Sequence, residues 1–179
     1  MPGPFDETRG AAEAAVSKIY ALDQVCVLLV EDSPYMAHLL GSMLKALRIG
    51  RVLRARGGLE AQELIDSRVS AMPGQAIDII LSDWHMEPVD GLALLKWVRA
   101  HRHENVRFLP FIMLTAAPEV NRVTLARDAG VTGFLRKPVT VDSLLPGPRN
   151  SVCFCFTMIA RWTAINAPIT SGTIRTCVM

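Results

Sequence analysis

Five residues of complementary chemistry each stand where an apolar run of the sequence ends. They are Glu31, Asp32, Asp83, Thr115 and Lys137. Three carboxylates held together raise one another's proton affinity, and a hard cation with oxygen ligands, such as Mg²⁺, relieves that repulsion. An ionised aspartate can attack a phosphoryl group, whose oxygens an ammonium and a hydroxyl can neutralise and orient. If the fold brings them together, the five residues favour metal-assisted phosphoryl transfer.

The elements that must position these residues follow from the hydrophobic pattern. Short apolar runs predict buried strands at 25–30, 77–83 and 110–115, with weaker candidates at 51–55 and 132–136. Helical spacing separates them, in a helix that starts at Ser33-Pro34 and in the segments 58–65, 92–98 and 119–129. This alternation predicts an α/β fold, a doubly wound five-stranded parallel sheet of the flavodoxin-like kind with helices on both faces.

In such a sheet, ligands bind at the carboxyl ends of the strands, which is where all five residues fall. Each residue also has a structural interpretation by itself. Glu31 and Asp32 could favour the start of the following helix through its dipole, and Asp83 could cap a turn. Thr115 could simply end a strand, and Lys137 could be a solvated charge. The coincidence of all five at one edge favours a functional site.

The motifs that carry these residues resemble the receiver domain of two-component response regulators. They read VLLVEDSPYM, IILSDWHMEPVDGLALLKWVR, PFIMLTA and AGVTGFLRKPV, from about residue 25 to about residue 145. The resemblance implies that Asp83 is the phosphoacceptor and that Glu31, Asp32, Asp83 and the backbone carbonyl of His85 hold Mg²⁺ or Mn²⁺. It also implies that Lys137 pairs with the phosphoryl group, and that Thr115 and the aromatic Phe134 form the switch.

The same resemblance implies a function and partners. A sensor histidine kinase or a phosphotransfer protein would donate the phosphoryl group, and the output would be protein–protein contact. The chain would be no enzyme in the usual sense, because it would catalyse only its own phosphoryl acceptance and release. A homodimer remains open.

Two other functions are compatible with this fold. The first is a phosphorylation-independent interaction module, which loss of the acidic residues or of Lys137 would favour; all are present. The second is a hydrolase with an aspartyl-phosphate intermediate. Such enzymes carry a second aspartate two residues after the nucleophile, where this chain has His85. A role for the His85 imidazole as a metal ligand is disfavoured, because carboxylates select a harder ion.

The sequence departs from the receiver pattern at two places. Glu87 stands four residues after Asp83, where the family usually has proline, and adds a carboxylate that could act on the site or face solvent. The final helix is truncated or altered, because the segment after Val139 meets Pro146-Gly147-Pro148. We therefore expect an N-terminal extension over 1–23, which could be helical or a frayed segment, and a receiver domain over 24–145. An atypical tail is expected over 146–179, and either a frameshift or a variable, partly ordered ending would explain it.

Composition and charge argue against nucleic-acid binding and membrane insertion. The net charge of +2 gives no argument for nucleic acid, and no run is long and apolar enough to insert in a membrane. The N-terminus lacks the apolar run of a signal peptide, so the expected location is cytoplasmic. The four cysteines are interpreted as reduced, with Cys26 in the core. The basic residues Arg48, Arg51, Arg54 and Arg56 read as a solvated face or as a site for a partner's acidic patch.

Overall fold

The computed structural model describes residues 22–70, 75–116 and 120–144. The strands are β1 (Cys26–Val30), β2 (Arg51–Ala55), β3 (Ile79–Asp83), β4 (Phe111–Thr115) and β5 (Gly133–Arg136). The helices are α2 (Pro34–Ala46), α3 (Gly58–Arg68), α4 (Gly91–Arg99), α5 (Glu104–Arg107), α6 (Val120–Asp128) and α7 (Val141–Leu144), preceded by the 3₁₀ turn η1 (Leu22–Gln24). The elements alternate as the hydrophobic pattern predicts.

The five strands form one sheet in the order β2-β1-β3-β4-β5, and every neighbouring pair is parallel. This order confirms the predicted doubly wound, flavodoxin-like sheet. The chain crosses from β1 outward to β2, and then from β2 back past β1 to β3, which lies on the other side of β1. The carboxyl ends of β1 and β3 therefore diverge at the topological switch point, where ligands bind in this class of fold.

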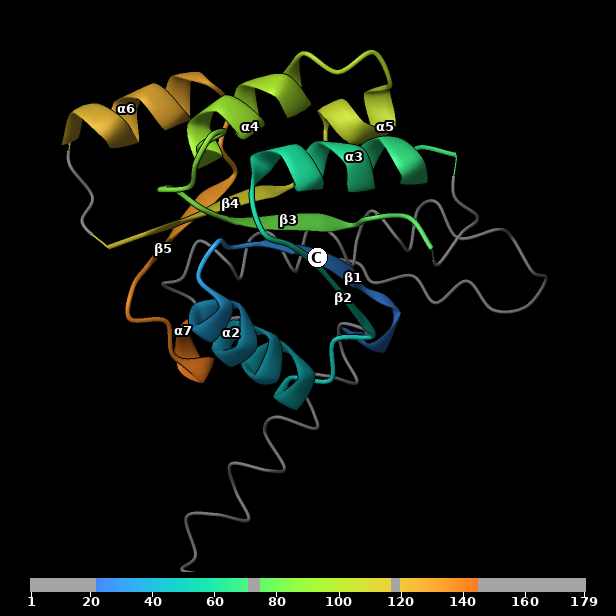
Figure 1. The fold of residues 1–179 in the computed structure, drawn as a ribbon, viewed down its shortest axis with the longest axis vertical. Helices are drawn as coiled ribbons and strands as arrows, with labels where there is room; N and C mark the ends of the chain where they lie inside the picture. The colour runs from blue at the N-terminus through green and yellow to red at the C-terminus, as the bar shows by residue number, and fades with distance from the viewer. Residues whose placement is uncertain (1–21, 71–74, 117–119, 145–179) are drawn as a thin grey trace, which may run out of the picture.

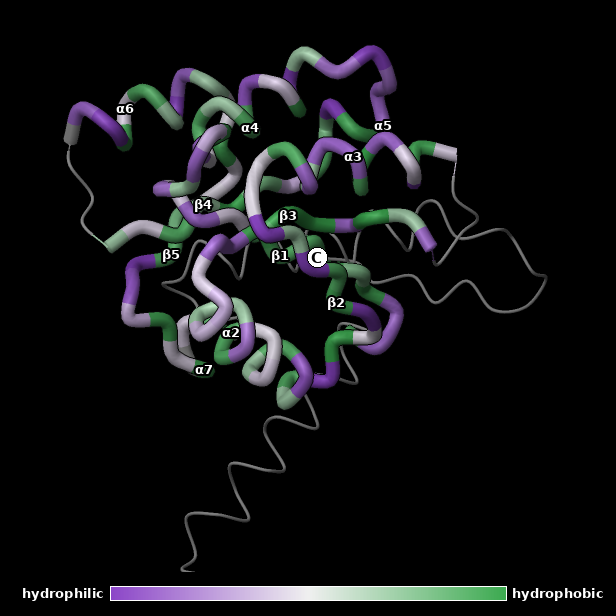
Figure 2. Tube along the Cα trace, in the orientation of Figure 1, coloured by the Kyte–Doolittle hydropathy of each residue, from purple (hydrophilic) through white to green (hydrophobic). Residues whose placement is uncertain are grey.

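Helices cover both faces of the sheet. In Figure 1, α2 and α7 lie on one face, and α3, α4, α5 and α6 lie on the other. Figure 2 shows apolar residues concentrated in the strands between these two layers. The core beneath α2 includes Leu40, Leu44 and Leu29, and the core on the opposite face includes Ile65, Leu94 and Phe111. Residues of β1, β3 and β4 are buried throughout, as expected for strands covered on both sides.

The predicted elements agree with the observed ones to within a few residues at each end. The four-residue helix α5 was not predicted, because one helical turn carries too little periodicity to stand out. The described part of the final helix is a single turn, α7, and the residues where truncation was expected lie outside the described part of the chain. The expected N-terminal extension, apart from η1, and the tail lie outside the described residues. In the described ranges, no helix is long and apolar enough to cross a membrane.

Candidate functional site

The acidic pair follows β1 directly. Glu31 is 2 % exposed, whereas Asp32 is exposed to solvent. The Glu31 side chain accepts a hydrogen bond from the backbone N–H of Ser33 at 3.4 Å. Ser33 also caps α2, because its hydroxyl accepts from the N–H of Met36. The helix start thus fixes the turn that places both carboxylates above the sheet.

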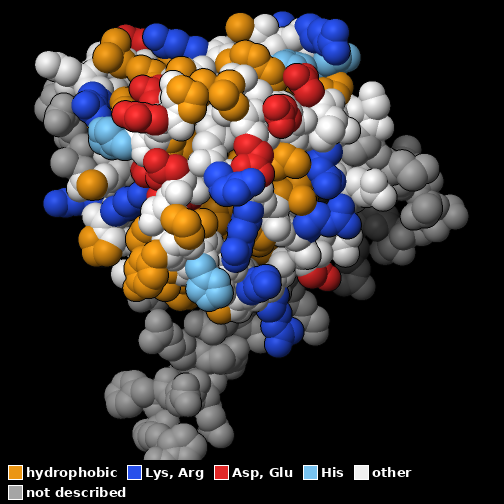
Figure 3. All heavy atoms as spheres, viewed as in Figure 1, with side chains coloured by type: hydrophobic (Ala, Val, Ile, Leu, Met, Phe, Trp, Pro, Cys, Tyr) orange, Lys and Arg blue, Asp and Glu red, His pale blue; other side chains and the backbone are white. Residues whose placement is uncertain are grey.

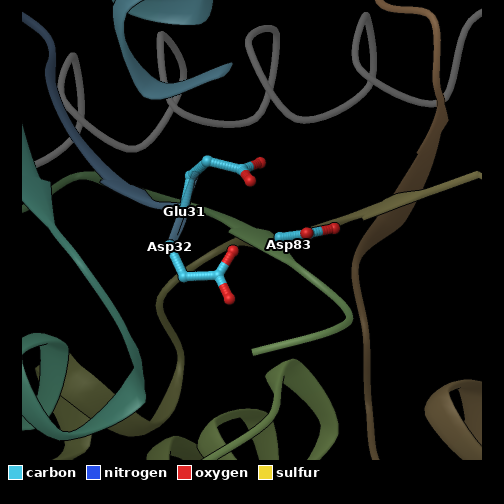
Figure 4. Close-up of side chains that lie close together, drawn as sticks. All are labelled: Glu31, Asp32 and Asp83. Carbon is cyan, nitrogen blue, oxygen red and sulfur yellow. The ribbon is translucent and has the colours of Figure 1, made fainter. Parts of the chain in front are cut away.

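Asp83 ends the adjacent strand and faces the acidic pair. Its side-chain oxygen Oδ1 accepts a hydrogen bond from the backbone N–H of Trp84 at 2.8 Å. Figure 4 shows Glu31 and Asp32 at the end of β1 and Asp83 at the end of β3, with the three carboxylates directed to the same side. One carboxylate oxygen from each residue lies within 4.8 Å of those of the other two. The convergence predicted from the sequence is therefore present.

Lys137 joins two of these carboxylates. Its Nζ lies 2.9 Å from Asp83 Oδ2 and 3.0 Å from Glu31 Oε2. The ammonium comes from the residue after β5, at the same edge of the sheet. A single cation thus partly neutralises two buried carboxylates that would otherwise repel each other.

Burial and these contacts together shift the pKa values of Glu31 and Lys137. Burial raises the pKa of Glu31, and this effect outweighs the lowering by the Lys137 hydrogen bond. Burial by itself would lower the pKa of Lys137, but the hydrogen bonds and charges of Asp83 and Glu31 together raise it. The lysine therefore keeps its positive charge in the site.

Thr115 and Phe134 lie on the strands beside the site. Thr115 ends β4 and is 5 % exposed, and its carbonyl accepts the backbone N–H of Lys137 at 2.8 Å. Phe134 is half-buried on β5, where it pairs with Met113 and packs against the core under α4. Both predicted switch residues thus occupy the two strands that follow Asp83 in the sheet order.

The segment after Asp83 places three further residues. Trp84 is 5 % exposed and belongs to the core on the α4 face of the sheet. The exposed His85 contacts Arg122 of α6 through its Nε2, and this guanidinium also lies 5.9 Å from the centre of the Trp84 ring. Arg122 was not anticipated from the sequence, where a lone arginine on a helix gives no signal.

Glu87 is exposed and lies outside the group of three carboxylates, which is consistent with the alternative that its side chain faces solvent.

Asp90 and Gly91 position helix α4 beside the site, although neither belongs to the group formed by the three carboxylates and Lys137. Asp90 caps α4, because its Oδ1 accepts the N–H of Ala93 at 2.7 Å. Gly91 lets α4 approach β3, since a Cβ atom there would lie 2.3 Å from the carbonyl oxygen of Asp83. This close approach of Gly91 to Asp83 is visible only in the tertiary structure, because the two residues lie on different elements.

The donor set fits a hard divalent cation. Three carboxylates from two adjacent strands supply oxygen ligands, and the exposure of Asp32 leaves one side open to water. Mg²⁺ and Mn²⁺ prefer oxygen ligands, and Mg²⁺ keeps several of its waters. The position of the His85 imidazole against Arg122 leaves it outside the carboxylate group.

Comparison with known proteins agrees with this geometry. The family model "Response regulator receiver domain" matches residues 27–146. Chemotaxis protein CheY-3 of Vibrio cholerae is 30 % identical over 118 residues, which cover 66 % of this chain and 84 % of that protein. Chemotaxis protein CheY1 of Helicobacter pylori is 32 % identical over 118 residues, 66 % of this chain and 89 % of that one.

Solved structures are similar in fold. The chain is similar to Vibrio cholerae CheY4 with a TM-score of 0.58 and 24 % identity, over 75 % of this chain and 98 % of that one. It is also similar to the receiver domain of the sensor histidine kinase PA1611 of Pseudomonas aeruginosa, with a TM-score of 0.57 and 26 % identity, over 78 % of this chain and 98 % of that one. That structure has a magnesium ion coordinated in its active-site cleft.

Proposed function

The chain belongs to the response regulator receiver family, and from that premise we propose that it is a phosphorylation-dependent signalling switch with Asp83 as the phosphoacceptor. A sensor histidine kinase or a phosphotransfer protein is the proposed donor, and a downstream protein is the proposed target. The proposal rests on one observation above the others. The ammonium of Lys137 contacts Asp83 and Glu31 at once, at 2.9 and 3.0 Å, beside an open group of three carboxylates.

The proposed reaction is a phosphoryl transfer with balanced bonds. A carboxylate oxygen of Asp83 attacks phosphorus, a new O–P bond forms, and the N–P bond of the donor phosphohistidine breaks, after which the freed imidazole nitrogen takes a proton. The product is an acyl phosphate on Asp83. Mg²⁺ or Mn²⁺, held by Glu31, Asp32, Asp83 and the His85 carbonyl, would supply charge neutralisation for the phosphoryl oxygens.

Lys137 has two successive roles in this scheme. Before transfer, it contacts the Asp83 carboxylate at 2.9 Å and orients it. After transfer, the phosphoryl group brings more negative charge than the carboxylate it modifies, so the ammonium would follow that charge. The raised pKa of Lys137, caused by Asp83 and Glu31 against the opposing effect of burial, keeps it protonated for both roles.

Thr115 and Phe134 would carry the response to the surface. The Thr115 hydroxyl is a donor for a phosphoryl oxygen, and its movement would free space that the half-buried Phe134 can enter. Phosphorylation would shift a pre-existing equilibrium rather than create a new state. The output surface would then involve β4, β5 and α6, which carry or follow these residues. In this scheme the protein turns over no separate substrate.

Tryptophan fluorescence tests the proposal directly, since Trp84 follows Asp83 and is buried beside the site. The purified protein is titrated with MgCl₂ and then with acetyl phosphate. We expect a magnesium-dependent change, followed by a phosphodonor response that Asp83→Asn abolishes. Trp84→Phe identifies the reporting residue, because Trp97 on α4 and Trp162 both remain in that variant.

Metal binding without a phosphodonor response would favour the phosphorylation-independent interaction module instead. Continuous release of phosphate from acetyl phosphate at an enzyme's rate would favour the hydrolase. In either case, intact-mass measurement after rapid quenching reports whether an acyl phosphate forms on the wild-type chain and is absent from Asp83→Asn.

A further inference from the structure

A band of exposed cations lies along the edge of the sheet that β2 forms. We define this basic band by its exposed members, Lys45, Arg48, Arg51, Arg54 and Arg56. Figure 3 shows Lys and Arg side chains running over the region that α2 and β2 occupy in Figure 1. Among the described residues, the ion pair that forms here joins Arg56 to Glu60 at 3.4 Å. The other four cations have no ion pair in the described part of the chain.

The Arg54 side chain packs against helix α2 at a position where the helix has a glycine. A Cβ atom on Gly41 would lie 2.2 Å from Arg54 Nη2, so the guanidinium lies directly over this glycine. Gly41 is buried in the middle of α2, where glycine is unfavourable relative to alanine. The helix thus has, at an intrinsic cost to its stability, a gap that the Arg54 guanidinium occupies.

The backbone of β2 offers hydrogen-bonding groups at the same place. Among the strands that the structure describes, β2 lies at the edge of the sheet and pairs with β1 alone. Arg51 donates its N–H to Val25, and Ala55 accepts the N–H of Glu31, so residues 51, 53 and 55 direct their backbone groups toward β1. By the alternation of a parallel ladder, the N–H and C=O groups of Val52 and Arg54 point outward.

From these features we propose that the β2 edge binds an acidic, extended segment of a partner protein, which adds to the sheet as a sixth strand. Outward N–H and C=O groups supply the main-chain bonds of strand addition, and the basic band supplies charge complementarity. The same arginines repel a second copy of this edge, which protects it from self-pairing. A nucleic acid would leave the strand's hydrogen-bonding groups unused, and a net charge of +2 is small for that partner.

The test uses the full chain and a fluorescein-labelled peptide in which glutamate alternates with threonine. We expect binding that weakens at least tenfold when glutamine replaces glutamate, and at least tenfold when alternate peptide nitrogens are methylated. Amide hydrogen exchange at Val52 and Arg54 should slow in the complex. Duplex DNA and phosphatidylglycerol vesicles serve as competing probes.

Two variants of the β2 edge and one control variant locate the binding site. Arg48→Glu with Arg54→Glu should weaken peptide binding at least tenfold, whereas Lys96→Glu with Arg127→Glu makes the same charge change on α4 and α6 and should have little effect. Gly41→Ala keeps every charge but displaces the Arg54 guanidinium, and should weaken binding several-fold. Unchanged thermal unfolding and acetyl phosphate response confirm that the variants are folded.

The proposal is overturned by any of three results. The first is no binding of the glutamate peptide at low salt, and the second is equal weakening by the α4 and α6 control pair. The third is binding of the N-methylated peptide as tight as that of the unmodified peptide, or binding of DNA or vesicles that is tighter than that of the peptide. Tighter binding of DNA or vesicles would mean that the basic band binds a partner through charge alone.

Discussion

The carbonyl oxygen of Thr115 accepts the backbone N–H of Lys137 at 2.8 Å, and this bond joins the ends of β4 and β5. The hydroxyl residue and the ammonium residue of the site are therefore tied through the main chain. Movement of the β4 end toward a phosphoryl group would carry along the backbone that bears Lys137. This bond would mechanically link the two functions proposed for these residues, which are pairing with the phosphoryl group and switching.

Loss of the Lys137 ammonium should separate metal binding from phosphorylation. In Lys137→Ala, Glu31 and Asp83 lose the cation they share, so we expect the free energy of unfolding to fall by about 1–3 kcal/mol without metal. Mg²⁺ should bind at least as tightly as in the wild type, because it no longer competes with the ammonium, while the acetyl phosphate response falls at least tenfold. Urea unfolding and fluorescence titration measure the two effects. Weaker Mg²⁺ binding would contradict the competition.

The close approach at Gly91 should make this position intolerant of a side chain. In Gly91→Ala, the new methyl group would collide with the Asp83 carbonyl oxygen at 2.3 Å and with Met113 Sδ at 2.7 Å. We expect destabilisation of about 1–3 kcal/mol, as for other overpacked sites, with a weakened phosphodonor response. Gly57→Ala is the matched control, since its nearest contact is an ordinary 3.7 Å. Equal urea midpoints for the two variants would contradict the prediction.

The two helix caps should differ in strength. Asp90 accepts the Ala93 N–H at 2.7 Å, whereas Ser33 accepts the Met36 N–H at 3.4 Å. Asp90→Ala should therefore lower the free energy of unfolding by about 1 kcal/mol, and Ser33→Ala by roughly half as much. Chemical unfolding of the two variants makes the comparison. Asp90→Asn keeps the accepting oxygen and should recover most of the loss.

Asp78 should make stability fall as pH rises through the acidic range. Its Oδ2 accepts the Cys26 N–H at 2.8 Å, and burial raises the pKa of this carboxyl despite that bond. The folded chain therefore holds the Asp78 proton more firmly than the unfolded chain. Its contribution is largest below the ordinary aspartate pKa and is lost as pH rises through the raised one. Relative to Asp78→Asn, the wild type should lose unfolding free energy across that window, which urea unfolding at several pH values measures. A wild type that gains stability there would contradict the sign.

The sequence determined the α/β class and the identity of the site. Buried strands such as Ile79–Asp83 appear as continuous apolar runs, and the parallel arrangement requires their carboxyl ends to meet. For this reason the sequence alone assigns Glu31, Asp32 and Asp83 to one edge of the sheet. Local rules also sufficed for the helix start at Ser33, since the hydrogen bond of this cap spans only three residues.

The tertiary structure alone decided what depends on contacts distant in sequence. The Lys137 bridge to Glu31 spans 106 residues, and its choice of two carboxylates follows from how β1, β3 and β5 lie in the sheet. The steric need for Gly91 and Gly41, and the contact of Arg122 with His85, likewise arise between separate elements. No periodicity encodes such pairs, because packing fixes them only after the elements have assembled.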